Sequence, residues 1–163
     1  MIGAFVKAME AQAGRVHRLG KIEEVADTIS TILGEAKKIA VAPALKSIDW
    51  GALAPEFRPG EITDQVGVTK AIAGIAETGT LVFASDADNP PSLNFVPEVS
   101  FAVLHEKEIV AAQEDVWAKL PKANMPATIN LVTGPSRTGD IEQTLYLGAH
   151  GPKELHVLLI KGP

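Results

Sequence analysis

Polar residues with the types and spacing to hold a small anion gather near the end of the chain. They sit in and around two glycine turns and carry hydroxyl, guanidinium, carboxylate and imidazole groups: Gly134, Ser136, Arg137, Thr138, Asp140, His150 and Gly151. Glycine turns expose backbone N–H groups, and an arginine can hold a carboxylate through two parallel hydrogen bonds. We therefore predict a ligand site for a small carboxylate or other anion here. His150, between two glycines, is the histidine we select for proton transfer.

A second group is the run Glu77-Thr78-Gly79-Thr80. Thr78, Gly79 and Thr80 are predicted to contribute hydroxyls and free backbone N–H groups to the same anion site, and Glu77 is a candidate nucleophile or general base. The alternative for Glu77 is a hairpin residue exposed to water. A third group, Asp86, Asp88 and Asn89, could be a metal pair or simply turn formers. We predict no metal site.

The stretch from residue 127 to residue 160 must position most of these side chains. Residues 127–132 and 155–160 have the length and β-branched content of buried strands. Between them we predict a helix that starts near residues 138–140 and stops at Gly148. Its N-terminus would point unpaired N–H groups at the anion. The alternative, which the sequence leaves open, is that Ser136 and Thr138 only form a turn and cap this helix.

The rest of the chain alternates helix and strand, which favours parallel strands joined by crossovers. Helices are expected at residues 2–13, 21–36, 44–53 and 114–120, and a polar loop at 55–60. Strands are expected at residues 15–19, 38–42, 65–69, 71–76, 80–84, 99–104 and 107–110. Residues 77–79 would turn a hairpin, with Gly79 at positive φ. We therefore predict one α/β domain over residues 1–163, with a mixed, mostly parallel sheet.

Composition narrows the functions that the chain could have. Its 163 residues include 15 basic and 20 acidic side chains, a net charge of −5, with no basic run. Binding to nucleic acid or to an anionic membrane surface is therefore not expected. The absence of cysteine excludes disulfides, a thiol nucleophile and cysteine ligation of zinc or iron–sulfur clusters by this chain. Early charges at Lys7 and Glu10, and no apolar run of membrane length, predict a cytoplasmic protein.

Three runs resemble the LUD-domain family. They are Ala-Glu-Thr-Gly-Thr-Leu-Val from Ala76, Asn-Pro at Asn89, and the long Gly-Pro-Ser-Arg-Thr-Gly-Asp…Gly-Ala-His-Gly-Pro run from Gly134. The resemblance covers nearly the whole chain, although such proteins often carry a further N-terminal segment that is short or missing here. Gly139 stands where alanine is more familiar.

The resemblance implies a three-layer α/β/α sandwich of the type shared with ribose-5-phosphate isomerase and class I CoA transferases. It also implies a role in bacterial oxidation of L-lactate to pyruvate, in which partner proteins hold the iron–sulfur clusters. This chain would then be a subunit that binds no cofactor of its own and that could form a homodimer. The alternative is a stand-alone enzyme or binding protein for small phosphorylated or CoA-linked acids. Such an enzyme would use Glu77 as CoA transferases use a glutamate.

Overall fold

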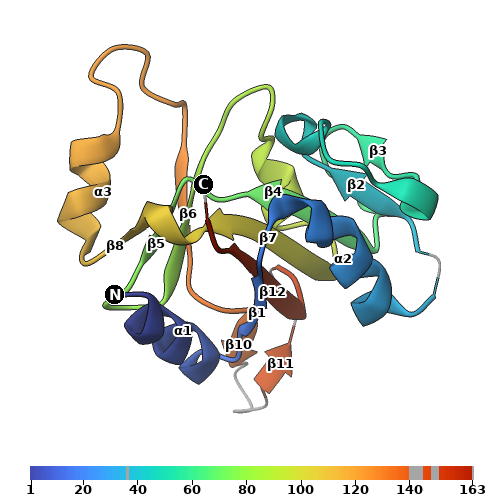
Figure 1. Cartoon of the computed structure of the whole chain (residues 1–163), viewed down its shortest axis with the longest axis horizontal. Coiled ribbons are helices and arrows are strands. Elements are labelled where there is room, and N and C mark those ends of the chain that lie inside the picture. Colours follow the sequence, from blue (N-terminus) through green and yellow to red (C-terminus); the bar gives the residue numbers. More distant parts are fainter. Residues whose placement is uncertain (36, 140–144, 148–150, 163) are drawn as a thin grey trace.

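The fold is built around a six-stranded parallel sheet (Figure 1). It is seen in a computed structural model that describes residues 1–35, 37–139, 145–147 and 151–162, with only the backbone described at 138, 139 and 145–147. The strand order is β1-β12-β7-β4-β2-β3, and every neighbouring pair is parallel. Its strands are β1 (Arg15–Leu19), β2 (Ile39–Val41), β3 (Glu56–Phe57), β4 (Val66–Lys70), β7 (Val99–His105) and β12 (Glu154–Ile160).

A second, four-stranded sheet contains two antiparallel strand pairs and one parallel pair. Its order is β8-β5-β6-β9, and β6 is antiparallel to both of its neighbours, whereas β5 and β8 are parallel. Its strands are β5 (Ala73–Ile75), β6 (Thr80–Ala84), β8 (Ile109–Val110) and β9 (Ile129–Val132). The predicted α/β class with a mostly parallel central sheet is confirmed, with the refinement that the described antiparallel pairs lie outside the central sheet.

The described residues also form three helices and five 3-10 turns. The helices are α1 (Ile2–Ala11), α2 (Val25–Leu33) and α3 (Gln113–Lys119). The 3-10 turns are Ile22–Glu24, Pro43–Leu45, Gly51–Leu53, Pro91–Asn94 and Glu106–Glu108. The helix expected over residues 44–53 is wrong: two 3-10 turns stand there, and Gly51, with φ of 51°, interrupts the helical path. The loop expected at 55–60 contains the short strand β3.

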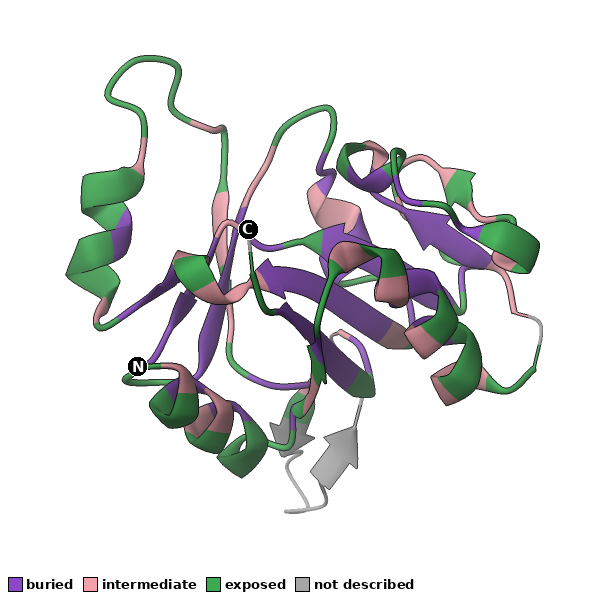
Figure 2. Cartoon of the chain, viewed as in Figure 1, coloured by how far each residue is buried: buried purple, intermediate pink, exposed green. Residues whose placement is uncertain are grey.

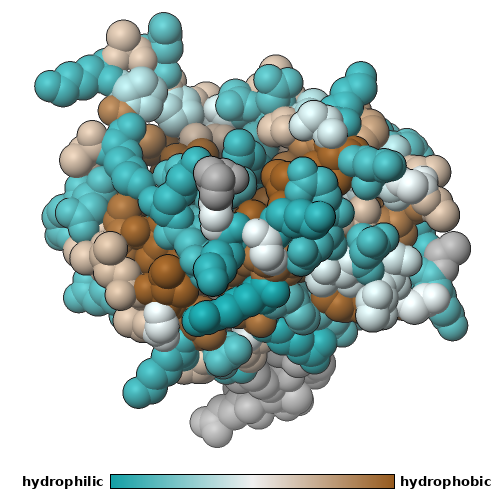
Figure 3. All heavy atoms as spheres, in the orientation of Figure 1, coloured by the Kyte–Doolittle hydropathy of each residue, from teal (hydrophilic) through white to brown (hydrophobic). Residues whose placement is uncertain are grey.

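Apolar side chains cover both faces of the central sheet. Phe101 and Val103 of β7 pack on the side of α2, while Ala102 and Leu104 pack on the side of α1 and the small sheet. This alternation follows from the two-residue period of a strand, and both faces are buried, as expected for a parallel sheet. Figure 2 shows most strands of both sheets as the buried centre of the molecule, whereas β1, β3 and β9 are largely intermediate or exposed. On the face drawn in Figure 3, polar side chains divide the apolar surface into small areas.

The helix expected from residues 138–140 to Gly148 is also wrong. Its described parts are two antiparallel strands, β10 (Arg137–Gly139) and β11 (Leu145–Leu147), with Thr138 opposite Tyr146. β-Branched and aromatic residues such as Thr138 and Tyr146 favour strands, and Gly139 weakens a first helical turn. The predicted helix N-terminus therefore cannot supply N–H groups to an anion.

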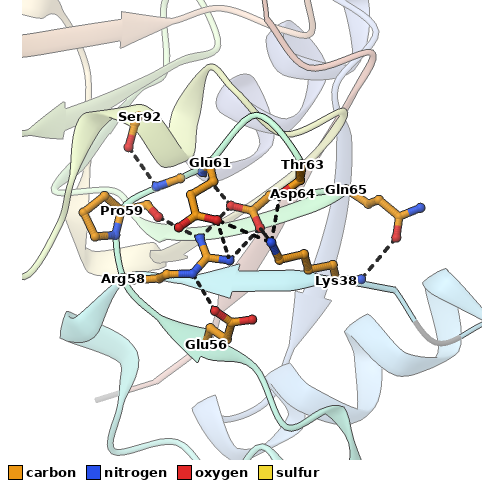
Figure 4. A network of polar contacts seen from close by, with 10 residues as sticks. Lys38, Glu56, Arg58, Pro59, Glu61, Thr63, Asp64, Gln65 and Ser92 are labelled. Atoms are coloured by element: carbon orange, nitrogen blue, oxygen red, sulfur yellow. Dashed lines mark hydrogen bonds and ion pairs between the residues drawn. The ribbon is translucent and has the colours of Figure 1, made fainter.

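A polar network ties the loop between β3 and β4 to the central sheet (Figure 4). Both terminal nitrogens of Arg58 donate to the two carboxylate oxygens of Asp64 at 2.8 Å, and the Asp64 side chain is fully buried. The backbone N–H of Glu61 donates to Asp64 at 2.7 Å, and Lys38 lies 3.8 Å from it. These donors, with the Arg58 hydrogen bonds first, lower the pKa of Asp64 despite its burial.

Candidate functional site

The turn at residues 77–80 is the predicted hairpin. β5 and β6 pair antiparallel, and the N–H of Gly79 donates to the carbonyl of Ile75 at 2.9 Å. Gly79 has φ of 66°, and a Cβ there would overlap the backbone of Met9 in α1. The expectation of positive φ at Gly79 is confirmed, and the residue is needed twice, for its conformation and for its close approach to the helix.

Three threonine hydroxyls form a hydrogen-bonded row beside this turn. Thr80 Oγ1 lies 2.7 Å from Thr78 Oγ1 and 2.7 Å from Thr133 Oγ1. The pairing of Leu81 with Val132 between β6 and β9 brings Thr80 and Thr133 together although 53 residues separate them. Thr80 is only 5% exposed, whereas Thr78 and Thr133 are exposed. The buried central hydroxyl thus holds two outer hydroxyls that solvent can reach.

Gly134, the first residue of the predicted site run 134–151, lies against the C-terminal end of α1, the helix that Gly79 also contacts. It has φ of 86°, and a Cβ there would overlap the backbone oxygen of Gln12, just after α1. Gly79 and Gly134 therefore contact successive parts of α1, and the loops that bear them meet at its C-terminal half. The structure brings together the 77–80 turn and Gly134, as a shared site would require.

A cavity of about 620 Å³ opens beside the threonine row. We call it the threonine cavity, and its lining consists of Ala8, Ala11, Gln12, Glu77, Thr78, Thr80, Gln113, Leu131 and Thr133. Its polar groups are hydroxyls, two side-chain amides and one exposed carboxylate, that of Glu77. Hydroxyls and amides both donate and accept hydrogen bonds, so this lining suits a small polar ligand. Thr133, Gln12 and Gln113 were not predicted from sequence. The β6–β9 pairing brings Thr133 here, and the packing of α1 and α3 brings Gln12 and Gln113.

Of the remaining predicted site residues, some are described by the structure and others lie outside the described residues. The backbone N–H of Ser136 donates to the carbonyl of Pro152 at 2.9 Å, and a Cβ on Gly151 would lie 3.4 Å from Cβ of Ser136, so the two glycine turns are neighbours. Arg137 is exposed at the start of β10 and is not among the residues that line the threonine cavity. Thr138 is described only as backbone in β10. Asp140 and His150 lie outside the described residues.

The Asp86–Asn89 group forms a turn. Asp86 Oδ1 accepts a hydrogen bond from the N–H of Asp88 at 2.8 Å. The buried Asn89 amide bonds both the N–H and the carbonyl of Lys70, at 3.2 and 2.9 Å. These contacts explain the residues as turn and loop anchors. Within the described residues there is no group of three or more His, Cys, Asp and Glu that could hold a metal ion.

A histidine pair that sequence patterns did not single out joins the middle of β1 to the amino-terminal half of β12. His17 Nε2 is 2.9 Å from His156 Nδ1, and His156 Nε2 is 3.1 Å from Glu154 Oε2. Since a carboxylate only accepts, neutral His156 donates from Nε2 and accepts from His17 at Nδ1. His156 is 1% exposed and stacks on Phe101. Burial lowers the pKa of both histidines, although Glu154 opposes this at His156.

Comparisons with known proteins agree with this fold. A family model described as LUD domain matches residues 2–160. A solved structure of a DUF162-family protein from Deinococcus radiodurans superposes with a TM-score of 0.70, covering 99% of this chain and 96% of that one. Its sequence identity is 20%, so it speaks for the fold alone.

Curated relatives match over a little more than half of the chain. An uncharacterized protein of Neisseria meningitidis serogroup B is 38% identical over 96 residues, which are 58% of this chain and 41% of that protein. The lactate utilization protein C of Macrococcus caseolyticus is 37% identical over 92 residues, or 53% of this chain and 40% of that protein. The matches therefore span less than half the length of these relatives. No described helix is long and apolar enough to cross a membrane.

Proposed function

We propose, from the premise that this chain belongs to the LUD domain family, that it is a component of a bacterial L-lactate utilisation system. The observation that carries the proposal is its similarity to proteins named lactate utilization protein C, at 30 to 37% identity in two of them. The family model extends this similarity to residues 2–160.

Within that system we assign the chain the role of a subunit without an iron–sulfur cluster. Oxidation of L-lactate to pyruvate releases two electrons and two protons. The electrons need an acceptor, and a chain without cysteine offers no thiolates to hold a cluster. The clusters would therefore lie in partner proteins, and this chain would hold the carboxylate substrate or product.

The threonine cavity is the place we propose for that ligand. Lactate carries a carboxylate, which accepts hydrogen bonds, and an α-hydroxyl, which donates and accepts. Thr78 and Thr133 present exposed hydroxyls on either side of the buried Thr80 hydroxyl, so their orientations are coupled through two bonds of 2.7 Å. A row fixed in this way can donate outward to a carboxylate with little loss of side-chain entropy. In the full proposal Gly79, Gly134, Ser136, Arg137, Thr138, Asp140, His150 and Gly151 complete the site.

One observation also favours the second candidate function, a stand-alone enzyme or binding protein for phosphorylated or CoA-linked acids. Glu77 lines the threonine cavity and is exposed, so its carboxylate is accessible to a ligand there. A carboxylate nucleophile needs such access. The two candidates predict different effects of Glu77→Gln. If the chain only binds, the variant would strengthen lactate binding, because it removes a like charge from the cavity lining. If Glu77 is the nucleophile, the variant would abolish acyl or CoA transfer.

Calorimetric titration with L-lactate and pyruvate tests the proposed site. Thr133→Val keeps the shape of an exposed side chain and removes one outer hydroxyl, and we expect about tenfold weaker binding, as for a hydrogen bond to a charged group. Thr80→Val should also weaken binding, because it releases both outer hydroxyls.

Thr31→Val is the matched control for this titration. Thr31 is exposed on α2, and its hydroxyl donates to the carbonyl of Asp27 at 2.9 Å, far from the threonine row in the described fold. Affinity should be unchanged in this variant. Equal affinity in the wild type, Thr133→Val and Thr80→Val would remove the threonine cavity as the lactate site.

A further inference from the structure

A second cavity, of about 520 Å³, lies under helix α3. We call it the α3 cavity. Its walls come from the start of β5, the end of β6, α3 and the segment that leads from α3 toward β9: Ile72, Ala73, Ala84, Ser85, Asp86, Glu108, Val116, Lys119, Leu120, Pro121, Asn124 and Pro126. It shares no lining residue with the threonine cavity. Figure 1 shows α3 and this segment standing out from the body of the fold.

The α3 cavity lies near the carboxyl ends of the central strands. Ile72 follows the end of β4 by two residues, and Glu108 follows the end of β7 by three. Ligands of open α/β sheets bind at this edge. The threonine cavity, in contrast, is lined by the turn that joins β5 to β6 and by the C-terminal half of α1. The two cavities thus lie at opposite ends of the β5–β6 hairpin, the α3 cavity at its open end and the threonine cavity at its turn.

The lining of the α3 cavity is mainly apolar. Val116 is fully buried and packs in one cluster with Ala73, and Ile72 lies against the same cluster. Leu120, Pro121 and Pro126 add aliphatic surface from the α3 side. An apolar hollow of a few hundred Å³ with a few polar groups is typical of small-molecule sites. This surface favours a ligand with a hydrocarbon body.

One negative charge in the lining is left without a countercharge. Lys119 Nζ lies 3.2 Å from Glu108 Oε2, so these two charges balance each other. Asp86 takes part in no ion pair within the described chain, and the N–H of Asp88 fixes its Oδ1 at 2.8 Å. The charged lining residues are therefore two carboxylates and one ammonium, a net charge of −1.

From this arrangement we propose that the α3 cavity binds a small organic amine in its protonated form. The ammonium group pairs with the Asp86 carboxylate, and a short aliphatic or aromatic body fills the space against Val116 and Leu120. A carboxylate ligand would have to displace Glu108 from Lys119 and would face Asp86 unpaired. The charge pattern therefore selects cations over anions of the same shape. This proposal is independent of the lactate site.

Three probes of equal chain length test the charge preference: hexylammonium, 1-hexanol and hexanoate, titrated by NMR against the full chain. We expect hexylammonium to bind most tightly, with shift changes around Val116 and Ala84, and hexanoate not to bind. Asp86→Asn should weaken hexylammonium at least about fivefold, because it removes a charge-assisted hydrogen bond. Asn keeps the turn, since its side-chain oxygen can still accept from Asp88.

Asp88→Asn is the matched control. Asp88 is exposed two residues further on and does not line the cavity, so hexylammonium affinity should stay unchanged. Ala84→Leu should fill the cavity and abolish binding of hexylammonium and hexanol alike, with a melting curve confirming the fold. No hexylammonium binding to the wild type, equal affinity for all three probes, or equal losses in Asp86→Asn and Asp88→Asn would each overturn the proposal.

Discussion

Gly79 sets how closely the threonine-bearing turn approaches helix α1. Its φ of 66° suits glycine, and its missing side chain leaves room for the backbone of Met9. These two requirements can be separated, because Gly34 has nearly the same φ, 68°, and a Cβ added there would meet nothing within 4 Å. The pair therefore isolates close packing from backbone conformation.

We predict that Gly79→Ala destabilises the protein by about 3 kcal/mol or more, since strain at positive φ adds to overlap with α1. Gly34→Ala should cost less, about 1–3 kcal/mol, from backbone strain alone, because no atom lies within 4 Å of the added Cβ. Urea unfolding of both variants measures the difference. Equal costs would show that α1 can move away from the turn.

The His17–His156 pair predicts a pH dependence of stability. Burial lowers the pKa of both histidines from the ordinary value, as it also does at His105. A histidine with a lowered folded pKa contributes its full stability above the unfolded pKa of about 6.5, and this is lost as pH falls toward the folded pKa. The unfolded chain binds the proton first.

We therefore expect the unfolding free energy to fall between pH 7.5 and pH 5.5, by up to about 1.4 kcal/mol per pH unit for each histidine. The melting temperature should fall with it. His17→Gln should flatten this slope, since it removes one of the three titrating groups. Thermal unfolding at five pH values measures it. A wild-type melting temperature that stays constant or rises over this range would contradict the hydrogen-bonded pair.

At the scale of elements, the Arg58–Asp64 pair joins the two ends of the β3–β4 loop, and Lys38, just before β2, lies 3.8 Å from Asp64 (Figure 4). Removing Arg58 would leave a buried carboxylate with a distant partner, Lys38 at 3.8 Å. Buried pairs broken in this way cost about 3–5 kcal/mol, less where solvent reaches one partner, as it does at Arg58, 18% exposed.

We predict a loss of about 2–3 kcal/mol in the unfolding free energy of Arg58→Ala. Arg18→Ala is the control, because Arg18 is exposed and makes no described ion pair. Chemical denaturation of the two variants at pH 7 decides the matter. A change within about 0.5 kcal/mol, the range of ordinary surface substitutions, would show that Asp64 finds other donors.

Elements with a clear period or a marked end could be predicted from sequence. The strand 15–19 matches β1, and the turn 77–79 joins β5 to β6 as Gly79 suggested. The 138–148 helix could not be excluded, because Asp140 and Glu142 suit a helix start as well as a strand turn. The β10–β11 pairing that decides against it places Thr138 opposite Tyr146. Both residues favour strands, but this local propensity does not by itself specify which residues pair.

The candidate site could be predicted only where its residues lie in one run of the sequence. The 77–80 turn was found because hydroxyls and a glycine stand together, and Gly134 because it opens a glycine turn. Thr133 was not predicted because it becomes a site residue only through its hydrogen bond to Thr80, which depends on the pairing of β6 with β9. The His17–His156 pair was missed for the same reason, since 139 residues separate its members.

At the scale of the whole molecule, the two ends of the β5–β6 hairpin each border a cavity. The threonine cavity lies at the turn of the hairpin, beside α1, and the α3 cavity lies at its open end, near the carboxyl ends of β4 and β7. The family resemblance seen in sequence is confirmed by a LUD domain match over residues 2–160. The central claim is that the first of these cavities, built by Gly79, Gly134 and the threonine row on α1, holds the small carboxylate.

The most direct test is the position of L-lactate in a crystal structure of the full chain grown with saturating lactate. We predict its carboxylate within hydrogen-bond distance of Thr78 or Thr133, inside the cavity also lined by Glu77 and Gln113, and its absence there in Thr133→Val crystals. Lactate bound at another place, or the threonine cavity filled only by water at saturating lactate, would contradict the account.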